Sequence, residues 1–318
     1  MHDIIAFLKN AVSRKPQAGL QECFIIKDNF VFASDYSLQA GAPIESSINF
    51  NVPAAEFETA LVRIKNITGL EYDGQKITVK GGRLRASIQC IEGEPPALLV
   101  PNETMLPLPA GFMPAVQVAA NFVGETGWSS GIQFFGSKVL AFSNTAGVEI
   151  TVEGLNVEHT CMTPACAAFL LAQQNPPQEF LAARDRFVFR WGDGRWLRSQ
   201  PFAELASVEM LGRILTDAGS VAPVIITSDF KQAVEDVAAL SNGLIKIVPA
   251  QITGGVGATQ ATVDLPIEGL PDGFVSHWKA DVLAKMLTCA TAWNPAAYPK
   301  PSLFTGPNLR GVVLGCVG

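Results

Sequence analysis

The chain has 318 residues, of which 48% are hydrophobic and 16% are charged, a composition typical of a folded protein with two or three domains. The formal net charge of −6 excludes a molecule that is basic overall, although a basic stripe can exist within an acidic total. No apolar run reaches the roughly 18–20 residues of a membrane helix, and the N-terminal sequence lacks the basic and apolar regions of a secretory signal. We therefore expect a cytoplasmic protein without a membrane partner.

The cysteines and histidines are too scattered to indicate a metal site or a disulfide framework. None of the six cysteines forms a Cys-x-x-Cys pair, and the three histidines at 2, 159 and 277 lie far apart. This pattern predicts reduced core thiols. We expect no metal and no cofactor.

The first hundred residues alternate between helical and strand-like patterns. Residues 3–12 and 53–64 place apolar side chains on one helical stripe. Residues 24–35 are strand-like, and "KITVKGGRLRASIQ" (76–89) has two alternating runs around a glycine turn, which is typical of a β-hairpin. The predicted order is helix, strands, helix, hairpin. Apolar sequence before the first helix, present in the later units, is missing here.

The same order follows in the middle of the chain. Residues 109–123 and 163–174 predict helices, the second with Thr163 as its N-cap. Residues 131–144 predict strands, and "RFVFRWGDGRWLRSQP" (186–201) predicts a hairpin.

The last third repeats the order once more. Residues 227–240 and 277–290 have helical spacing, residues 244–252 and 261–267 are strand-like, and "PSLFTGPNLRGVVLG" (301–315) predicts a hairpin. The glycine-rich "TGGVGAT" (253–259) has no following Lys-Ser/Thr, so we expect a hairpin tip rather than a phosphate-binding loop.

A Leu-Arg dipeptide marks one position in all three units. It stands at 84–85, 197–198 and 309–310, after each hairpin turn, at intervals of 113 and 112 residues. Shared periodicity of this kind indicates an internal repeat. We expect each leucine to pack into its unit's core, whereas the pattern gives no role to the arginine.

Two connectors, 92–109 and 204–223, separate the units. They predict three domains at 1–106, 107–220 and 221–318.

Several segments together resemble the bacterial DNA polymerase III β subunits, the sliding clamps that act as processivity factors in DNA replication. The segments are "DNFVFASDYSLQAGAPI" (28–44), "FNVPAAEFETALVRI" (50–64), "YDGQKITVKGGRLRASI" (72–88), "TSDFKQAVEDVAALSN" (227–242) and "SLFTGPNLRGVVLG" (302–315). The resemblance implies an α+β fold of three repeated clamp domains, each with two helices packed on antiparallel sheet. It also implies a head-to-tail homodimer in which each chain forms half of a closed ring. The short chain suggests a diverged clamp of phage or mobile-element type.

The resemblance further implies a non-catalytic DNA polymerase holoenzyme subunit that encircles double-stranded DNA and tethers a replicative polymerase for processive synthesis. A clamp that slides should contact phosphates without reading bases, which calls for basic residues on the helix faces opposite the core. The candidates are Lys9, Arg14, Lys15, Arg63, Lys65, Lys231, Lys279 and Lys285. The middle unit's two helices contain no Lys or Arg; either they line the hole neutrally or nearby Arg184 and Arg186 supply charge.

The resemblance also implies a pocket through which the polymerase and the clamp loader dock short peptide motifs. Its candidates are Thr145, Gly147, Val148, Ile150, Pro223, Ile245, Ile247, Leu314, Cys316 and Val317. The loop at 141–150 lacks a basic residue, and the chain ends "LGCVG" rather than in a Met-Pro-containing tail. We therefore expect a different preferred peptide.

Two other classes of function stay open. An enzyme would need convergent polar groups, and the nearest motif is "GWSSG" (127–131), where Ser129 would need His159 or His277 as partner. We expect no enzyme. The alternative to the clamp is a clamp-like scaffold that recruits partners without encircling DNA.

Overall fold

The computed structural model describes residues 1–13, 20–46, 48–64, 66–207, 212–213, 215, 223–241, 243–256 and 259–317. The chain divides into two compact units. The first contains Met1–Leu108 and Ala165–Pro201, and the second contains Pro109–Pro164 and Phe202–Gly318. The predicted three-domain boundaries stay a prediction.

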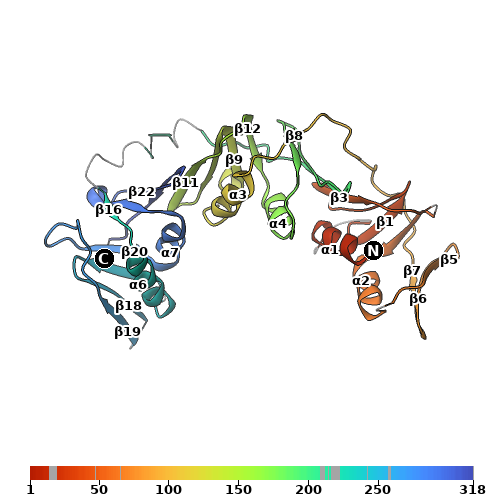
Figure 1. The fold of residues 1–318 in the computed structure, drawn as a ribbon, viewed down its shortest axis with the longest axis horizontal. Helices are drawn as coiled ribbons and strands as arrows, with labels where there is room; N and C mark the ends of the chain where they lie inside the picture. The colour runs from red at the N-terminus through yellow and green to blue at the C-terminus, as the bar shows by residue number, and fades with distance from the viewer. Residues whose placement is uncertain are drawn as a thin grey trace. The chain divides into compact units, whose positions relative to one another are not determined.

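The order of elements repeats three times along the chain: a helix, four strands, a second helix and three strands (Figure 1). The first repeat contains α1 (His2–Leu8), the 3-10 helix η1 (Lys9–Ala11), β1 (Cys23–Lys27), β2 (Phe30–Ser34), β3 (Leu38–Pro43), β4 (Phe50–Pro53), α2 (Ala54–Arg63), β5 (Gly69–Tyr72), β6 (Lys76–Gly81) and β7 (Leu84–Gln89). The second contains β8 (Leu106–Pro107), α3 (Phe112–Ala120), η2 (Gly127–Ser130), β9 (Ile132–Gly136), β10 (Lys138–Phe142), β11 (Ala146–Thr151), β12 (Val157–Met162), α4 (Pro164–Leu171), β13 (Glu179–Ala182), β14 (Phe187–Arg190) and β15 (Trp196–Ser199). The third contains β16 (Val224–Ile225), α6 (Ser228–Ala239), β17 (Leu244–Val248), β18 (Gln251–Val256), β19 (Thr259–Asp264), β20 (Ser276–Lys279), α7 (Ala280–Cys289), β21 (Ala292–Asn294), η3 (Pro295–Ala297), β22 (Ser302–Gly306) and β23 (Leu309–Val313). The predicted repeat of helix, strands, helix and strands is therefore confirmed.

The first unit is built on an eight-stranded antiparallel sheet in the order β4-β1-β2-β3-β15-β14-β13-β8. Strands of two repeats meet where β3 pairs with β15, with Gln39 opposite Arg198 and Gly41 opposite Trp196. On the helical side, Phe7 of α1 packs edge-on against Phe169 of α4 at 5.1 Å between ring centroids. We call this strand pair the first seam.

The second unit contains an equivalent sheet in the order β12-β9-β10-β11-β23-β22-β21-β16. Here β11 pairs with β23, and Glu149 lies opposite Arg310. This strand pair is the second seam. Both seams join the third strand after the first helix of one repeat, which we call its third strand, to the last strand of the next repeat.

Two smaller sheets complete the fold. The first unit has a three-stranded sheet, β5-β6-β7, and the second has a four-stranded sheet, β19-β18-β17-β20. Both are antiparallel. Among the described residues no strand pairs with the outer edges of β7 and β19.

The helix predicted at 227–240 is confirmed as α6, and its start has a clear physical cause. The Thr227 side chain accepts a hydrogen bond from the Phe230 amide at 3.1 Å, which satisfies one of the free amides of the first turn. Phe230, Val234 and Val237 then form the buried stripe. The helix α7 lies beside α6 (Figure 1).

The predicted start of the last helix at 277 is wrong. His277 and Lys279 belong to strand β20, and α7 begins only at Ala280. Trp278 is fully buried opposite Ile245 of β17. The large apolar ring therefore favours the sheet interior over a helix surface at this position.

The leucine of each Leu-Arg dipeptide was expected in a core, and this holds for Leu197 and Leu309, which are 0% and 6% exposed. It is wrong for Leu84, which is 49% exposed. The reason is the sheet edge: β15 and β23 are paired with a strand of a neighbouring repeat at the seams, whereas among the described residues β7 pairs with β6 alone.

The glycine-rich stretch at 253–259 is a hairpin, as expected, but its first four residues lie within β18 rather than at the tip. Within the described part of the chain, no helix is both long and apolar enough to cross a membrane.

Candidate DNA-binding and peptide-binding surfaces

The predicted DNA-facing residues that the structure describes all lie on or beside helices. Lys9 is in η1, Arg63 ends α2, Lys231 is on α6 and Lys285 is on α7. Lys279 is the N-cap of α7. All are exposed except the half-buried Lys231. Three further candidates, Arg14, Lys15 and Lys65, lie outside the described residues.

Acidic residues outnumber basic ones on these helices. The segments α1, η1, α2, α6 and α7 carry the four basic residues Lys9, Arg63, Lys231 and Lys285 beside the seven acidic residues Asp3, Glu56, Glu58, Asp229, Glu235, Asp236 and Asp281. The Lys9 ammonium lies 3.7 Å from a Glu58 carboxylate oxygen, with both side chains well exposed. A phosphate bound by these helices would therefore also lie close to carboxylates that repel it.

Two of the candidate lysines share a cavity in the second unit. Lys279 and Lys285 line a space of about 410 Å³ together with the end of α3 and the turn between β10 and β11. Asp281 and Glu125 line it as well. The cavity is therefore of mixed charge rather than a basic groove.

The helices α3 and α4 of the middle repeat carry no charged residue. Arg186, which was considered as a source of charge for this repeat, lies 3.1 Å from Glu103 and also pairs with Asp185. Its charge is therefore already balanced within the first unit.

The predicted peptide-pocket residues fall into two groups. The buried group cannot contact a peptide through its side chains in this conformation; it comprises Gly147, Val148, Ile150, Ile245 and Ile247. The accessible group comprises Thr145, Pro223, Leu314, Cys316 and Val317. Peptide docking at this set stays a prediction, and its contacts would come from the accessible group.

The C-terminal segment brings several accessible residues together. The Leu314 amide donates to the Thr145 carbonyl at 2.8 Å, and the Cys316 amide donates to the His277 carbonyl at 2.8 Å. The Tyr298 hydroxyl donates to the Cys316 carbonyl. The segment is thus fixed between β11 and β20, and it presents Val317, which is 86% exposed, to solvent.

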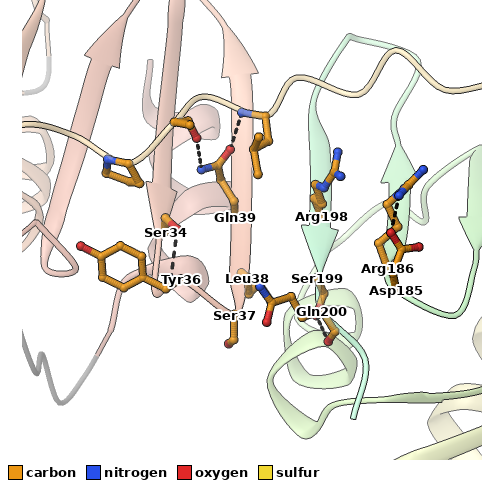
Figure 2. A pocket seen from close by; sticks show the side chains of 13 residues that line it. Ser34, Tyr36, Ser37, Leu38, Gln39, Asp185, Arg186, Arg198, Ser199 and Gln200 are labelled. Carbon is orange, nitrogen blue, oxygen red and sulfur yellow. Dashed lines mark hydrogen bonds and ion pairs between the residues drawn. The ribbon is translucent and has the colours of Figure 1, made fainter. Parts of the chain in front are cut away.

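The arginine of the Leu-Arg dipeptide has a role that the sequence pattern did not reveal: it holds a connector across a seam. Arg198 Nη1 donates to Glu103 Oε1 of the first connector at 3.1 Å. Opposite Arg198, Gln39 binds the same connector through the Ala97 carbonyl at 3.0 Å and the Leu99 amide at 2.8 Å. Figure 2 shows Gln39 and Arg198 on neighbouring strands below the connector.

This arrangement encloses a cavity of about 250 Å³ in the first unit, lined by residues of β2, β3, β15 and the connector. Arg198 and Arg186 both line it, and both lie 3.1 Å from Glu103. Two arginines face one carboxylate here, so the polar wall of the cavity holds the connector in place.

The second seam contains the same kind of contact between a Leu-Arg arginine and a connector. Arg310 Nη2 donates to the Leu215 carbonyl of the second connector at 2.7 Å, and both this pair and the Arg198–Glu103 pair are separated by 95 residues. Leu215 is buried against Val312 and Leu303. The sequence does contain a signal for these contacts. Gln39 in β3 and Glu149 in β11 are polar, whereas the other buried residues of both strands are apolar.

Replacing Glu103 by glutamine should lower the free energy of unfolding of the first unit by about 1–3 kcal/mol, because two partly buried guanidinium groups lose their carboxylate. Denaturation in urea measures the change. The matched control is Asp193→Asn, which removes an exposed Arg195 partner and should cost less than about 1 kcal/mol. Equal effects of the two substitutions would contradict the fastening role.

Ser129, the candidate nucleophile of the "GWSSG" motif, makes a hydrogen bond within its own turn. The Ser129 hydroxyl donates to the Thr126 carbonyl at 2.7 Å. The ring of His159 instead pairs with Gln133 at 3.1 Å, and burial lowers the His159 pKa. Ser129 and His159 therefore form no nucleophile–base pair.

No protein-family model and no curated protein matches the sequence. Solved structures do match over the whole chain. The β sliding clamp of Caulobacter crescentus has a TM-score of 0.83 at 14% identity, covering 100% of this chain and 96% of that one. The sliding clamp of Bartonella birtlesii, solved with griselimycin bound, has a TM-score of 0.82 at 14% identity, covering 100% and 97%. The DNA polymerase III β subunit of Thermotoga maritima has a TM-score of 0.79 at 12% identity, again covering 100% and 97%. The repeated helices, the two seams and these full-length matches together establish that the chain has the α+β fold of the bacterial DNA polymerase III β sliding clamps.

Proposed function

We propose that this protein is a diverged, non-catalytic DNA sliding clamp of phage or mobile-element type. Two copies would join head to tail around duplex DNA in the cytoplasm and tether a replicative polymerase for processive synthesis. The polymerase and the clamp loader would dock short peptides on the accessible residues around the C-terminal segment. Each copy would contribute its three predicted domains, so two copies together would form a ring of six domains.

One observation supports the ring above all others: the two seams leave one matching pair of strands unused. The third strands β3, β11 and β19 are each six residues long. Inside the chain, β3 pairs with β15 and β11 pairs with β23. The strands left over are β19 and β7, both sheet edges. Unpaired edges favour pairing with another chain.

The register of the second seam predicts how these edges would pair. There, Ala146 lies opposite Val313 and Ile150 opposite Leu309. Both β23 and β7 begin directly after a two-residue turn. We match the first residue of β19 to that of β11 and the first residue of β7 to that of β23. The register of the second seam then places Thr259 opposite Ile88, Ala261 opposite Ala86 and Val263 opposite Leu84.

This register matches the faces of the two strands. Leu84, Ala86 and Ile88 line an open groove of about 640 Å³ beside α2. Ala261 and Val263 are the less exposed residues of β19 and alternate with exposed ones. Since a slip of one residue would turn every side chain to the wrong face, agreement of the faces supports this pairing.

The test of the function is topological. Separated chains are assembled in the presence of nicked circular plasmid and passed through a gel-filtration column. A closed ring should stay with the circle and should be lost after the plasmid is linearised, because a ring slides off free ends. Equal retention on circular and linear DNA would contradict encirclement.

Salt dependence tests the proposed phosphate contacts. In duplex DNA each phosphate contact contributes about 0.9 to the slope of log affinity against log salt. The triple variant Lys9→Ala, Lys231→Ala, Lys285→Ala should therefore flatten the slope by about 2–3. The control is Lys27→Ala, Lys246→Ala, Lys300→Ala, three lysines outside the named helices, which should leave the slope unchanged. An unchanged slope in the first variant would remove these residues from the interface.

The excess of acidic residues on the helices favours one second candidate, a clamp-like scaffold that recruits partners without encircling DNA. It predicts normal pairing of two chains but no retention on circular plasmid. The retention experiment therefore separates the two functions.

A further inference from the structure

The first unit contains a cavity of about 240 Å³ with mostly apolar walls. It is lined by Ile26 of β1 in the main sheet, by Phe57 of α2 and by Leu70 of β5 in the small sheet. Of the described residues that line it, all but Glu45 and Ser46 are apolar. None of them lines the groove beside α2 where a second copy would pair. The cavity is therefore a separate feature of Met1–Leu108.

The third repeat shows which side chain stands at the position of Leu70. In both repeats the last strand begins with the Leu-Arg dipeptide, so its pairing matches Val79 of β6 to Phe304 of β22. Leu70 lies opposite Val79 in the first repeat. Trp293 lies opposite Phe304 in the third. Leu70 therefore occupies the place of Trp293.

A second match concerns Ile48, which also lines the cavity. The helices α2 and α7 begin directly after Pro53 and Lys279, which pair with the first residues of β1 and β17. Pro53 and Lys279 are therefore equivalent, and the residues that precede them can be matched one by one. Ile48 then occupies the place of Phe274.

In the third repeat, aromatic rings fill this place. Trp293 is 1% exposed, and its ring lies 5.9 Å from that of Phe274 and 6.0 Å from that of Phe304, measured between centroids. In the first repeat Leu70 is half-buried and Ile48 is 37% exposed. The smaller aliphatic side chains leave open a space that the third repeat fills with rings.

We propose that this cavity binds a small uncharged aromatic molecule of one or two rings. A cavity of roughly 150 Å³ with aliphatic and aromatic walls holds benzene, so about 240 Å³ has room for a two-ring system such as indole. Phe50 and Phe57 both line the cavity and offer rings for stacked or edge-on contact. A charged ligand would lose its hydration against the apolar walls, and an anion would also be repelled by Glu45.

The probe is indole, titrated into the full-length protein and followed by isothermal titration calorimetry. We expect a single class of saturable site, and indole should raise the midpoint of thermal unfolding because it binds the folded state. Leu70→Trp places an indole ring where the third repeat has Trp293, so the affinity for free indole should fall by at least about tenfold. Ile48→Phe is a smaller change in the same cavity and should weaken binding as well.

The matched control is Leu240→Trp. Leu240 is 57% exposed and does not line the cavity, so this variant carries the same added ring and should bind indole as the parent does. Circular dichroism and thermal unfolding check that each variant is folded. If Leu70→Trp does not fold, Ile48→Phe decides the outcome.

Three results would overturn the proposal. The absence of both a binding heat and a shift in the unfolding midpoint, with indole near its solubility limit, would show that the cavity takes no aromatic ligand. Unchanged affinity in the Leu70 and Ile48 variants would place the bound indole elsewhere. Tighter binding of a capped peptide with a central tryptophan, lost in the same variants, would identify a docking site for a partner's side chain instead of a small-molecule site.

Discussion

Leu84→Asp should convert a two-chain species of about twice 33.9 kDa into single chains. Leu84 is 49% exposed at the edge of β7 and lines the open groove beside α2. In the proposed pairing it meets Val263 of a second copy, so the substitution would bury an unpaired carboxylate at the interface. The loss of affinity should be at least about thirtyfold, since such a charge typically costs about 2–5 kcal/mol. Light scattering across a dilution series measures it.

The matched control is Val62→Asp. Val62 is 63% exposed on α2, close to the groove in sequence but not among the residues that line it. It should leave the mass unchanged. If Leu84→Asp has the mass of the parent at every concentration, β7 is not the pairing edge.

Gly41→Ala should lower the free energy of unfolding by about 3 kcal/mol, because the first seam has no room for a side chain there. A Cβ at this position would lie 2.4 Å from the ring of Trp196 on the paired strand. Trp196 is 1% exposed and cannot move aside into solvent. Urea denaturation followed by tryptophan fluorescence measures the change.

The control for this substitution is Gly69→Ala in β5. A Cβ there would meet nothing within 4 Å, and the change should stay within about 0.5 kcal/mol. Similar losses at the two positions would mean that the contact with Trp196 does not govern the effect, because the backbone entropy of a Gly→Ala change by itself favours the folded state.

Much of the fold could be predicted from local patterns. The stripe of Phe230, Val234 and Val237 locates α6, and Thr227 locates its start. The period of the Leu-Arg dipeptide gives the three repeats. The start of α7 could not be predicted in this way, because only pairing with β17 shows that Trp278 lies in a strand. Likewise, the first seam joins Leu38 to Ser199, which no local pattern records.

The candidate sites were less predictable, because charge and accessibility depend on tertiary neighbours. Helical spacing places Lys9 on a surface but does not reveal Glu58 at 3.7 Å. Apolar residues such as Val148 and Ile245 suit a pocket and a core equally well in sequence, and both are fully buried. The fastening of Glu103 by Arg198 spans 95 residues and became visible only in three dimensions.

The two unused edges also bear on how the protein can misassemble. The proposed pairing of β19 with β7 would join different surfaces of two copies, so it would be heterologous, and such contacts close into a ring only when the rotation between copies allows it. Two copies that meet at both edges form a finite particle. Copies that meet at one edge leave one β7 and one β19 open and can add further copies without limit. The strand pair that would encircle DNA is therefore also the one through which this protein could polymerise into fibres.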